Sequence, residues 1–448
     1  MSDRRILRLG TGAGFSSDRL EPAIELARDG ALDVLVFETI GERTLAFGHR
    51  DRRADPTRGY NPHLAARMRA VLGPCGQSGT RIVTNMGVAN VEAAARVTLD
   101  AARAVGRDGL TVAIVLGDDV TDLISRDMPL MEMPGRTIGD IPQTLICANA
   151  YLGTDALLPA LETGADVVLT GRVADPSLFL APIVHAFGWS LDDWHRLGQG
   201  TLVGHLMECG MQVTGGYFAD PGFKDVPRLE ACGYPIAEID SDGAATITKL
   251  PGTGGRVSPA TVKEQLLYEV HDPARYLTPD VSADFTNTRI TETSVDRVHV
   301  AGGSGSPRPD HLKATVAFDG GLMAEAEISY AGVTALARAE LARDVLAERL
   351  HRLVGDKGPL RFDLIGVSAL HASAGRVGPV PDDVRVRVAF RSHDAEACNL
   401  VLWETEAMLC CGPAGGGGFR GRATPSVVTY SVLVPRSSIQ TRVEVARP

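Results

Sequence analysis

The chain has 448 residues, more than one hydrophobic core usually holds, so we expect two domains or three. Its 45 basic and 55 acidic residues give a net charge of −10 without any block of Lys or Arg, which argues against nucleic acid and anionic membrane surfaces as partners. Apolar residues form 44% and charged residues 22% of the sequence, a balance typical of a soluble globular protein.

Cysteine usage and the first residues indicate the compartment. The seven cysteines include no CxxC pair, which excludes a zinc ribbon and a thioredoxin-type motif and favours free thiols in a reducing compartment. Residues 1–14 lack the apolar core of a signal peptide, and no apolar run approaches the ~20 residues of a spanning helix. We therefore predict a cytoplasmic protein.

The N-terminal half alternates short apolar runs with helical stretches. Asp18 is the expected N-cap of the first helix and Gly30 its C-terminal glycine. Four of the strands are apolar on both faces, so the pattern predicts an α/β domain over residues 1–229, with a mostly parallel sheet flanked by helices. The predicted strands are 4–9, 32–39, 80–87, 110–119 and 166–172, the predicted helices are 20–30, 64–73, 91–106 and 157–165, and 144–153 is ambiguous.

The pattern changes after a glycine-rich stretch at 198–225 and a turn-rich stretch that runs to about 259. It predicts a second, α+β domain over residues 230–448. Its expected elements are a strand pair at 236–249 around Asp242–Gly243, a helix at 259–270, a hairpin at 312–330 around Gly320–Gly321, helices at 333–354 and 394–411, and strands at 360–367, 384–391 and 426–434.

Parallel sheets bind ligands beyond the carboxyl ends of their strands. The residues predicted at this edge are Gly10 to Gly14, Glu38, Asn85, Asp118, Asp119, Thr170, Gly171, Arg172 and Asp175.

Three glycines, Gly10, Gly12 and Gly14, follow the first strand in "LRLGTGAGFSSDR". Glycine N–H groups at a helix N-terminus can hold an anion, and Phe15 and the hydroxyls of Ser16 and Ser17 lie beside them. The dinucleotide motif needs G-x-G-x-x-G, which this spacing does not match, although Glu38 ends the next strand at a suitable distance. A plain tight turn or another anion is favoured over NAD, and the NAD-dependent oxidoreductase stays as an alternative.

Several stretches resemble the acyclic terpene utilisation family AtuA, in the same order along nearly the whole chain. They are "GTGAGFSSDR", "DVLVFETIGERT", "RIVTNMGVAN", "LTGRVADPSLFLAP", "GHLMECGMQVTGG", "YPIAEI", "KLPGTGGRVSPATVKEQLLYEVHDPARYLTPDV" and "GPAGGGGFRG". The chain departs from the family pattern at Ser17, where the family has glycine, and at 301–309, where it tends to have an Arg-containing turn.

The resemblance implies an enzyme of the catabolism of branched acids and their CoA thioesters, most plausibly a lyase or hydratase. Many family members add a small C-terminal domain or have it as a separate protein. The chain is similar to the main domain alone, which implies a small companion subunit. The resemblance also implies a homo-oligomer.

The segment "GHLMECGMQVTGG" contains the best candidates for catalysis. On a helix His205, Glu208 and Cys209 share one face, and Gln212 continues it towards Gly215 and Gly216. Glu208 is the expected general acid or base, with His205 as its partner. A second hypothesis is that the Cys209 thiolate acts as a nucleophile. A metal site would need more ligands than these two residues supply. The structural alternative is an ordinary amphipathic turn with a buried cysteine.

Other polar residues give weaker signals. Arg172 can bind a carboxylate or phosphate in two parallel hydrogen bonds, but with Asp175 it also reads as a surface ion pair. Asp118 and Asp119 form a pair of neighbouring carboxylates. Such a pair can have two different pKa values, can bind a divalent cation or can include a helix N-cap. Asn85 and Asn149 suit either a substrate carbonyl or a turn.

Two further glycine loops suggest anion sites. Residues 249–258, "KLPGTGGRVS", could bind CoA phosphates or a carboxylate through N–H groups at Gly254 and Gly255, although the ATP-binding order of residues is absent. Residues 410–422 suit a lid, an oligomer contact or a ligand-binding backbone.

Together these residues predict one pocket that binds a small anionic substrate, a carboxylic acid or its CoA thioester. Its cofactor stays open and no metal ligand is assigned. A partner-dependent or non-catalytic subunit is the alternative. Glu208, His205 and Cys209 are the candidate catalytic residues, and the candidate substrate-binding residues are Gly12, Gly14, Phe15, Ser16, Glu38, Asn85, Asp118, Arg172, Asp175, Gln212, Gly215, Gly216, Gly254 and Gly255.

Overall fold

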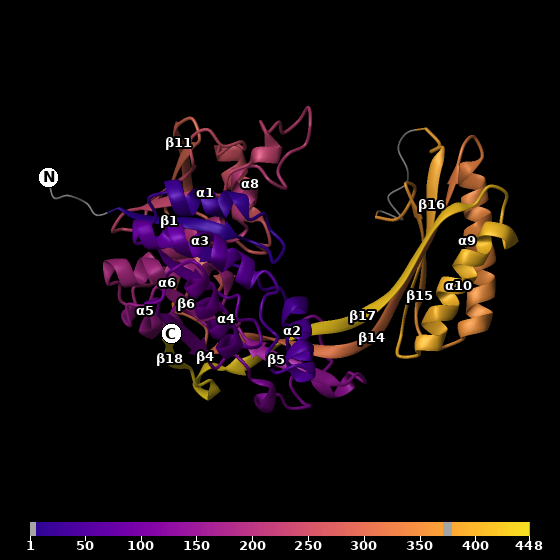
Figure 1. The fold of residues 1–448 in the computed structure, drawn as a ribbon, viewed down its shortest axis with the longest axis horizontal. Helices are drawn as coiled ribbons and strands as arrows, with labels where there is room; N and C mark the ends of the chain where they lie inside the picture. Colours follow the sequence, from indigo (N-terminus) through magenta and orange to yellow (C-terminus); the bar gives the residue numbers. More distant parts are fainter. Residues whose placement is uncertain (1–5, 371–378, 448) are drawn as a thin grey trace. The chain divides into compact units, whose positions relative to one another are not determined.

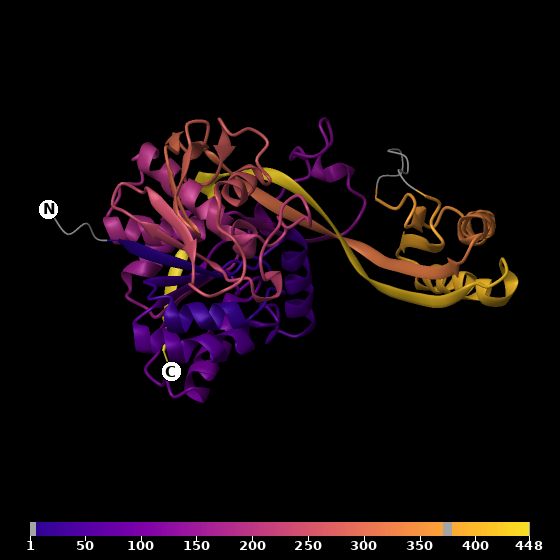
Figure 2. The ribbon, with the colours of Figure 1, turned by 90° about the horizontal axis from the view of Figure 1, so that it is seen from above.

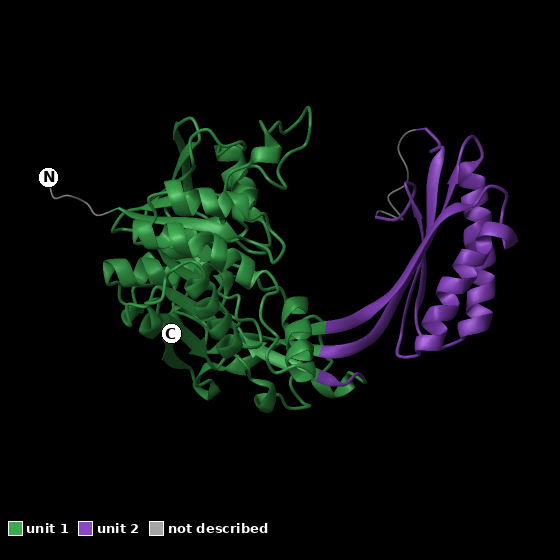
Figure 3. Cartoon of the chain, viewed as in Figure 1, with its two compact units in different colours: residues 1–142, 146–317, 429–448 green, residues 143–145, 318–428 purple. Residues whose placement is uncertain are grey.

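The chain forms two compact units. A computed structural model describes residues 6–370 and 379–447, so the first five residues of the N-terminal segment lie outside it. Residues 1–142, 146–317 and 429–448 belong to the first unit, and residues 143–145 and 318–428 to the second (Figure 3). The boundary expected between residues 229 and 230 falls inside the first unit, because the segment after it adds strands to the first sheet.

Five parallel strands form the centre of the first unit. In spatial order they are β1 (Leu7–Ala13), β2 (Val34–Phe37), β3 (Arg81–Thr84), β6 (Val167–Thr170) and β4 (Val112–Leu116). Almost every one of their residues is buried, as the doubly apolar runs predicted. The parallel sheet expected in the N-terminal half is therefore confirmed.

Helices cover both faces of this sheet (Figure 1). The helices α1 (Glu21–Asp29), α3 (Leu64–Ser78) and α4 (Val91–Ala104) bury apolar side chains against one face, in a core that includes Phe37 and Leu169. The helices α5 (Thr154–Glu162), α6 (Asp175–Phe187) and α7 (Trp194–Glu208) cover the other face, with Val36 and Val168 in their core. The helices α2 (Glu42–Ala54) and α6 were not predicted.

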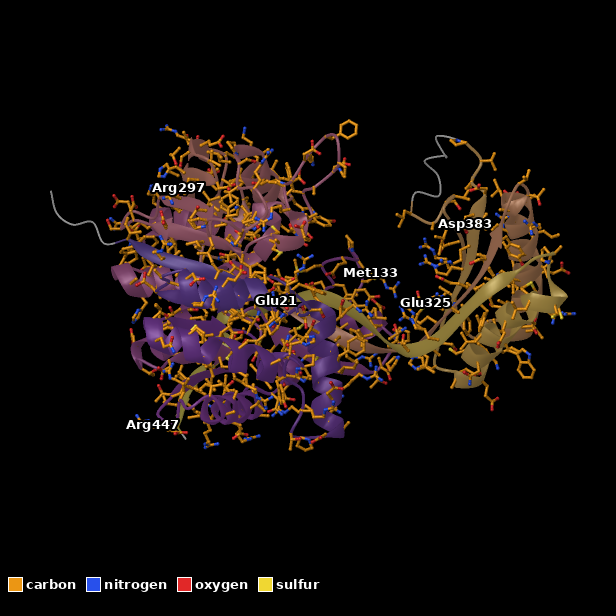
Figure 4. The ribbon with its side chains drawn as sticks, turned by 45° about the horizontal axis from the view of Figure 1, so that its top comes forward. Glu21, Met133, Arg297, Glu325, Asp383 and Arg447 are labelled. Atoms are coloured by element: carbon orange, nitrogen blue, oxygen red, sulfur yellow. The ribbon has the colours of Figure 1, made fainter. Side chains whose placement is uncertain are left out.

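Antiparallel strands extend the sheet to ten. Beside β1 follow β7 (Pro235–Ile239), β8 (Ala245–Lys249), β12 (Arg297–Ala301) and β11 (Arg289–Ser294), so the predicted strand pair at 236–249 is present. Glu238 of β7 accepts hydrogen bonds from Arg8 of β1 and from Arg297 of β12. Figure 4 labels Arg297. At the other edge β18 (Arg442–Ala446) pairs with β4, and Figure 2 shows the yellow C-terminal residues returning to this unit.

Smaller elements complete the first unit. These are β5 (Leu145–Ala150), α8 (Pro259–Leu267) and a three-stranded sheet of β9 (Tyr276–Leu277), β10 (Ser282–Asp284) and β13 (Ser304–Ser306). The first helix starts later than expected, because Leu20 is its N-cap while Asp18 accepts the N–H of Gly14 at 2.8 Å.

The second unit is a sheet with two helices on one face (Figure 1). Its strand order is β15 (Leu360–Ile365), β16 (Asp383–Ser392), β14 (His311–Ala331) and β17 (Gly417–Pro435), and its helices are α9 (Ala335–Val354) and α10 (Ala395–Cys411). Its core packs Ile328 and Val386 against Leu346 and Val401. The strands β14 and β17 contain residues of both units.

The hairpin expected around Gly320 and Gly321 is wrong, because β14 is one strand of 21 residues. A Cβ atom on Gly321, whose φ is 72°, would lie 2.6 Å from the Ser392 carbonyl oxygen, and one on Gly320 would lie 3.0 Å from Ser426 Oγ. Close approach of neighbouring strands therefore explains these glycines, and a turn does not.

Packing of α7 on α6 depends on one glycine. A Cβ atom on Gly204 would lie 2.6 Å from the Pro176 carbonyl oxygen and 2.9 Å from its Cα, and neither backbone atom can move away freely. We expect Gly204→Ala to lower the free energy of unfolding by about 1–3 kcal/mol. Gly109→Ala, where the added carbon would meet nothing within 4 Å, is the matched control and should change it by less than about 1 kcal/mol. Urea unfolding followed by circular dichroism measures both, and equal midpoints would contradict the expectation.

Candidate functional site

A cavity of about 1500 Å³ opens at the carboxyl edge of the parallel strands. All of its lining residues belong to the first unit. They come from the ends of β1, β2 and β6, the first turn of α6, the last turn of α7 and the segments 211–217, 268–282 and 306–313, together with Met131, Tyr151 and Leu433. This position is the usual ligand site of an open parallel sheet, and the volume exceeds the ~300–1,000 Å³ of most small-molecule pockets.

Nine residues predicted from the sequence line this cavity. They are Gly14, Phe15, Glu38, Arg172, Asp175, Glu208, Cys209, Gln212 and Gly216. The other predicted residues, which are Gly12, Ser16, Asn85, Asp118, His205, Gly215, Gly254 and Gly255, lie outside its lining. Segments far apart in the sequence thus converge on one cavity.

Glu208 and His205 form a buried pair at the end of α7. Glu208 Oε1 lies 2.9 Å from His205 Nδ1, whereas Glu208 Oε2 has no hydrogen-bond partner. His205 Nε2 lies 3.2 Å from the Leu266 carbonyl oxygen, which can only accept, so Nε2 carries a hydrogen. The pair therefore shares its exchangeable proton between Nδ1 and Oε1.

Burial sets the proton affinity of this pair. Loss of solvent raises the pKa of Glu208 to about 7, against the opposing effect of His205. Burial alone would lower the pKa of His205, but the Glu208 carboxylate outweighs it and the net direction is upward. A carboxyl group that titrates near neutrality suits proton transfer in either direction.

Arg172 is a buried cation held by several elements. Its Nη2 donates to Asp175 Oδ1 at 2.6 Å and its Nη1 to the Ile40 carbonyl oxygen at 2.6 Å, while its Cζ lies 4.1 Å from the centre of the Tyr151 ring. Glu38 Oε1 lies 3.9 Å from Nη1. Arg172 Nε is buried and has no partner. The surface ion pair considered above is excluded, since only 3% of this side chain is exposed.

Polar residues behind the lining orient it. Asn85 Nδ2 donates to Glu38 Oε1 at 2.9 Å, and Asn85 Oδ1 accepts the N–H of Thr39 at 2.8 Å. Asp118 Oδ2 accepts the backbone N–H of Arg172 at 2.7 Å and Asn149 Nδ2 at 2.9 Å. Asn85 and Asp118 therefore position Glu38 and Arg172 from outside the cavity.

Burial also raises the pKa values of three other carboxyl groups at or behind the cavity wall, those of Glu38, Asp175 and Asp118. For Glu38 the rise is large, and the nearby Asp175 carboxylate adds to it. Asp175 itself shifts upward through burial despite Arg172, and Asp118 rises to about 6 through burial. The wall of the cavity thus holds carboxyl groups that retain protons more strongly than usual.

The opening glycines serve packing and not phosphate binding. A Cβ atom on Gly12 would lie 2.4 Å from the Phe37 ring, and one on Gly14 would lie 2.4 Å from the backbone carbon of Cys209. The Gly14 N–H donates to Asp18, and Ser16 Oγ accepts from Asn61 Nδ2 at 3.1 Å. The seven residues from Gly14 to Leu20 separate the strand from α1, which is unlike the tight strand-to-helix turn of a dinucleotide site.

The glycine loop at 249–258 does not present free N–H groups. The N–H of Gly254 donates to the Ala231 carbonyl oxygen at 2.7 Å, and that of Gly255 to the Pro227 carbonyl oxygen at 2.8 Å. Gly215 has a φ of 112° and packs against Val226. Neighbouring carbonyl groups thus already use the donors of Gly254 and Gly255, which argues against the expected phosphate cradle at this loop.

Cys209 lines the cavity as a neutral thiol. Burial, followed by the nearby Glu208 carboxylate, raises the pKa of Cys209 well above its usual value. This environment argues against the thiolate nucleophile considered above.

Sequence reasoning missed several lining residues. Tyr151 donates to Glu42 Oε1 at 2.7 Å, and Lys313 Nζ lies 3.7 Å from the same oxygen. Tyr276 packs against the His205 ring at 5.2 Å between centroids. Glu269 also lines the cavity, with a φ of 58° that non-glycine residues seldom adopt. These residues come from an ambiguous segment, the start of a helix, a turn and two strands, and no local motif marks them.

Two features of the described residues concern metals and membranes. Within residues 6–370 and 379–447 no group of three or more His, Cys, Asp or Glu side chains could hold a metal ion. None of the helices in the same residues combines the length and apolar character needed to cross a bilayer.

Comparisons with known proteins agree with the resemblance noted above. Residues 7–445 match the model of the family described as acyclic terpene utilisation family protein AtuA. No curated protein matches the sequence. Among solved structures, a hydantoinase/carbamoylase family amidase from Burkholderia ambifaria is similar over 26% of this chain and 30% of its own, with 18% identity and a TM-score of 0.16.

The buried pair predicts a pH dependence of stability. Because the folded pKa values of Glu208 and His205 are both raised, the folded state holds more protons than the unfolded chain between about pH 4.5 and 7. The free energy of unfolding should therefore fall as the pH rises through this range, and Glu208→Gln should flatten that slope. Urea unfolding at several pH values measures it, with the exposed Glu162→Gln as control, and an unchanged slope in Glu208→Gln would contradict the assignment.

Proposed function

Because the chain belongs to the acyclic terpene utilisation family AtuA, whose name indicates a catabolic role, we propose that it is an enzyme of carboxylic acid or acyl thioester breakdown. The proposed reaction is of the lyase or hydratase type and moves a proton next to a carbonyl group. One observation carries this proposal. Glu208 is a cavity-lining carboxyl group with one oxygen paired to His205, the other without a partner and a pKa near neutrality.

Glu208 is the proposed catalytic residue and His205 its positioning residue. The fixed Nε2–H bond to the Leu266 carbonyl oxygen turns Nδ1 towards Oε1 and leaves Oε2 as the base. When Oε2 takes a proton from the carbon beside a carbonyl group, the electron pair of that C–H bond moves onto the carbonyl oxygen. In an elimination this pair then expels the group at the next carbon, and addition of water runs the same steps in reverse.

Arg172 is the proposed partner of the developing oxyanion. Its guanidinium is fixed by Asp175, Ile40 and Tyr151, so it needs no reorganisation when negative charge appears. Its unpartnered Nε is a donor of the kind that an enolate oxygen needs.

The size of the cavity supports a substrate larger than a small acid. A volume of about 1500 Å³ leaves room for the carrier part of an acyl thioester beside the reacting carbons. Arg275 and Lys313 line the same cavity and could contact the anionic groups of such a carrier.

Isotope exchange tests this proposal without knowledge of the full reaction. The purified chain should exchange α-hydrogens of a branched acyl thioester or acid for deuterium in D2O, followed by proton NMR. Glu208→Gln should slow the exchange at least ~100-fold, because it removes the base. Glu162→Gln, on the exposed end of α5, is the control and should leave the rate unchanged. Exchange by Glu208→Gln at the wild-type rate would reject the proposed base, and exchange by the lone chain would exclude an obligatory companion subunit.

The neutral state of Cys209 gives a second test of the assignment. Cys209→Ala should keep the exchange rate within about tenfold of wild type, because a thiol that stays protonated offers no thiolate nucleophile. The same NMR assay measures it. A loss of exchange rate as large as that of Glu208→Gln would indicate that Cys209 acts as a nucleophile after all.

A further inference from the structure

The cavity around Glu208 is acidic. Its lining carries seven carboxyl groups, from Asp18, Glu38, Glu42, Asp175, Glu208, Glu269 and Asp310, and three Arg or Lys side chains, from Arg172, Arg275 and Lys313. Three of the carboxyl groups, those of Glu38, Asp175 and Glu208, are at least two-thirds buried, whereas Arg172 is the one buried cation of this lining. The electrostatic balance of this wall therefore differs from that of an anion-binding site.

Arg172 is also largely neutralised by the protein. Asp175 and the Ile40 carbonyl oxygen accept from its two terminal nitrogens, and Glu38 lies 3.9 Å away. A free carboxylate usually binds arginine through two parallel hydrogen bonds from two nitrogens. Here only Nε is without a partner, which suits a single carbonyl oxygen.

We infer that the substrate presents an uncharged carbonyl group to Glu208, as in an ester, thioester or amide, and that a free carboxylate is excluded at this position. This inference rests on the proposed function and narrows its substrate class. A carboxylate here would lie beside Glu38, Asp175 and Glu208, whose side chains are mostly buried, so the repulsion between like charges is screened less than at an exposed surface. An uncharged carbonyl meets no such repulsion and accepts one hydrogen bond from Arg172.

The raised proton affinities agree with this picture. Nearby carboxylates contribute to the upward pKa shifts of both Glu38 and Glu208, with Asp175 acting on each of them. These groups already repel one another in the empty cavity. The substrate was expected to be anionic, but the part of it that lies beside Glu208 is therefore uncharged. Anionic groups on a more distant part of the substrate could still contact Arg275 and Lys313.

A matched pair of small probes tests the inference directly. Isobutyramide and isobutyrate have the same shape but differ in charge, and ligand-observed NMR titration measures their binding to the full chain at pH 8. We expect the wild type to bind the amide at least tenfold more tightly. Binding of isobutyrate as tight as that of isobutyramide, or no detectable binding of the amide, would overturn the inference.

Variants locate the source of the preference. Glu38→Gln keeps an oxygen that can accept from Ile40 N and Asn85 Nδ2 but cannot ionise at any pH, so it should reduce the amide preference several-fold. Glu162→Gln should leave the preference unchanged. If Glu38→Gln leaves the ratio of isobutyramide to isobutyrate affinity unchanged, repulsion by Glu38 is not the source of the preference. Because no turnover is measured, the probe ratio and the isotope exchange can fail independently of each other.

Discussion

The candidate site depends on one buried guanidinium. Arg172 follows the end of β6, and it connects Asp175 in the first turn of α6, the Ile40 carbonyl group beyond β2 and the ring of Tyr151. Asp118, beyond β4, accepts its backbone N–H. A buried charge is costly unless it is paired and hydrogen-bonded, so the segments that supply these partners must stay together. The geometry at the carboxyl edge of the sheet follows from that constraint.

The parallel part of the first unit was largely predictable, because its strands are apolar on both faces and alternate with helices, whereas the place of residues 230–317 in the same unit was not. The convergence of Glu38, Arg172 and Asp175 followed from their places at strand ends. The His205–Glu208 contact followed from a spacing of three residues on a helix. In each case a local pattern decides the outcome.

Tertiary contacts explain what could not be predicted. The N–H groups of Gly254 and Gly255 look available in the sequence, but carbonyl groups of residues 227 and 231 accept them. Gly320 and Gly321 look like a turn, yet both lie inside the single strand β14, where a Cβ atom on either would meet a neighbouring strand. Tyr151, Tyr276 and Lys313 line the cavity because distant segments fold onto its edge, and the sequence around each of them carries no signal of that contact.

The hydrogen bond from His205 to the Leu266 carbonyl group connects the Glu208 pair to the wall of the cavity. Leu266 lies just before the segment 268–279, which supplies many residues of that wall. This bond decides which ring nitrogen faces Glu208, so the tautomer of the buried pair is fixed by a backbone group 61 residues farther along the chain.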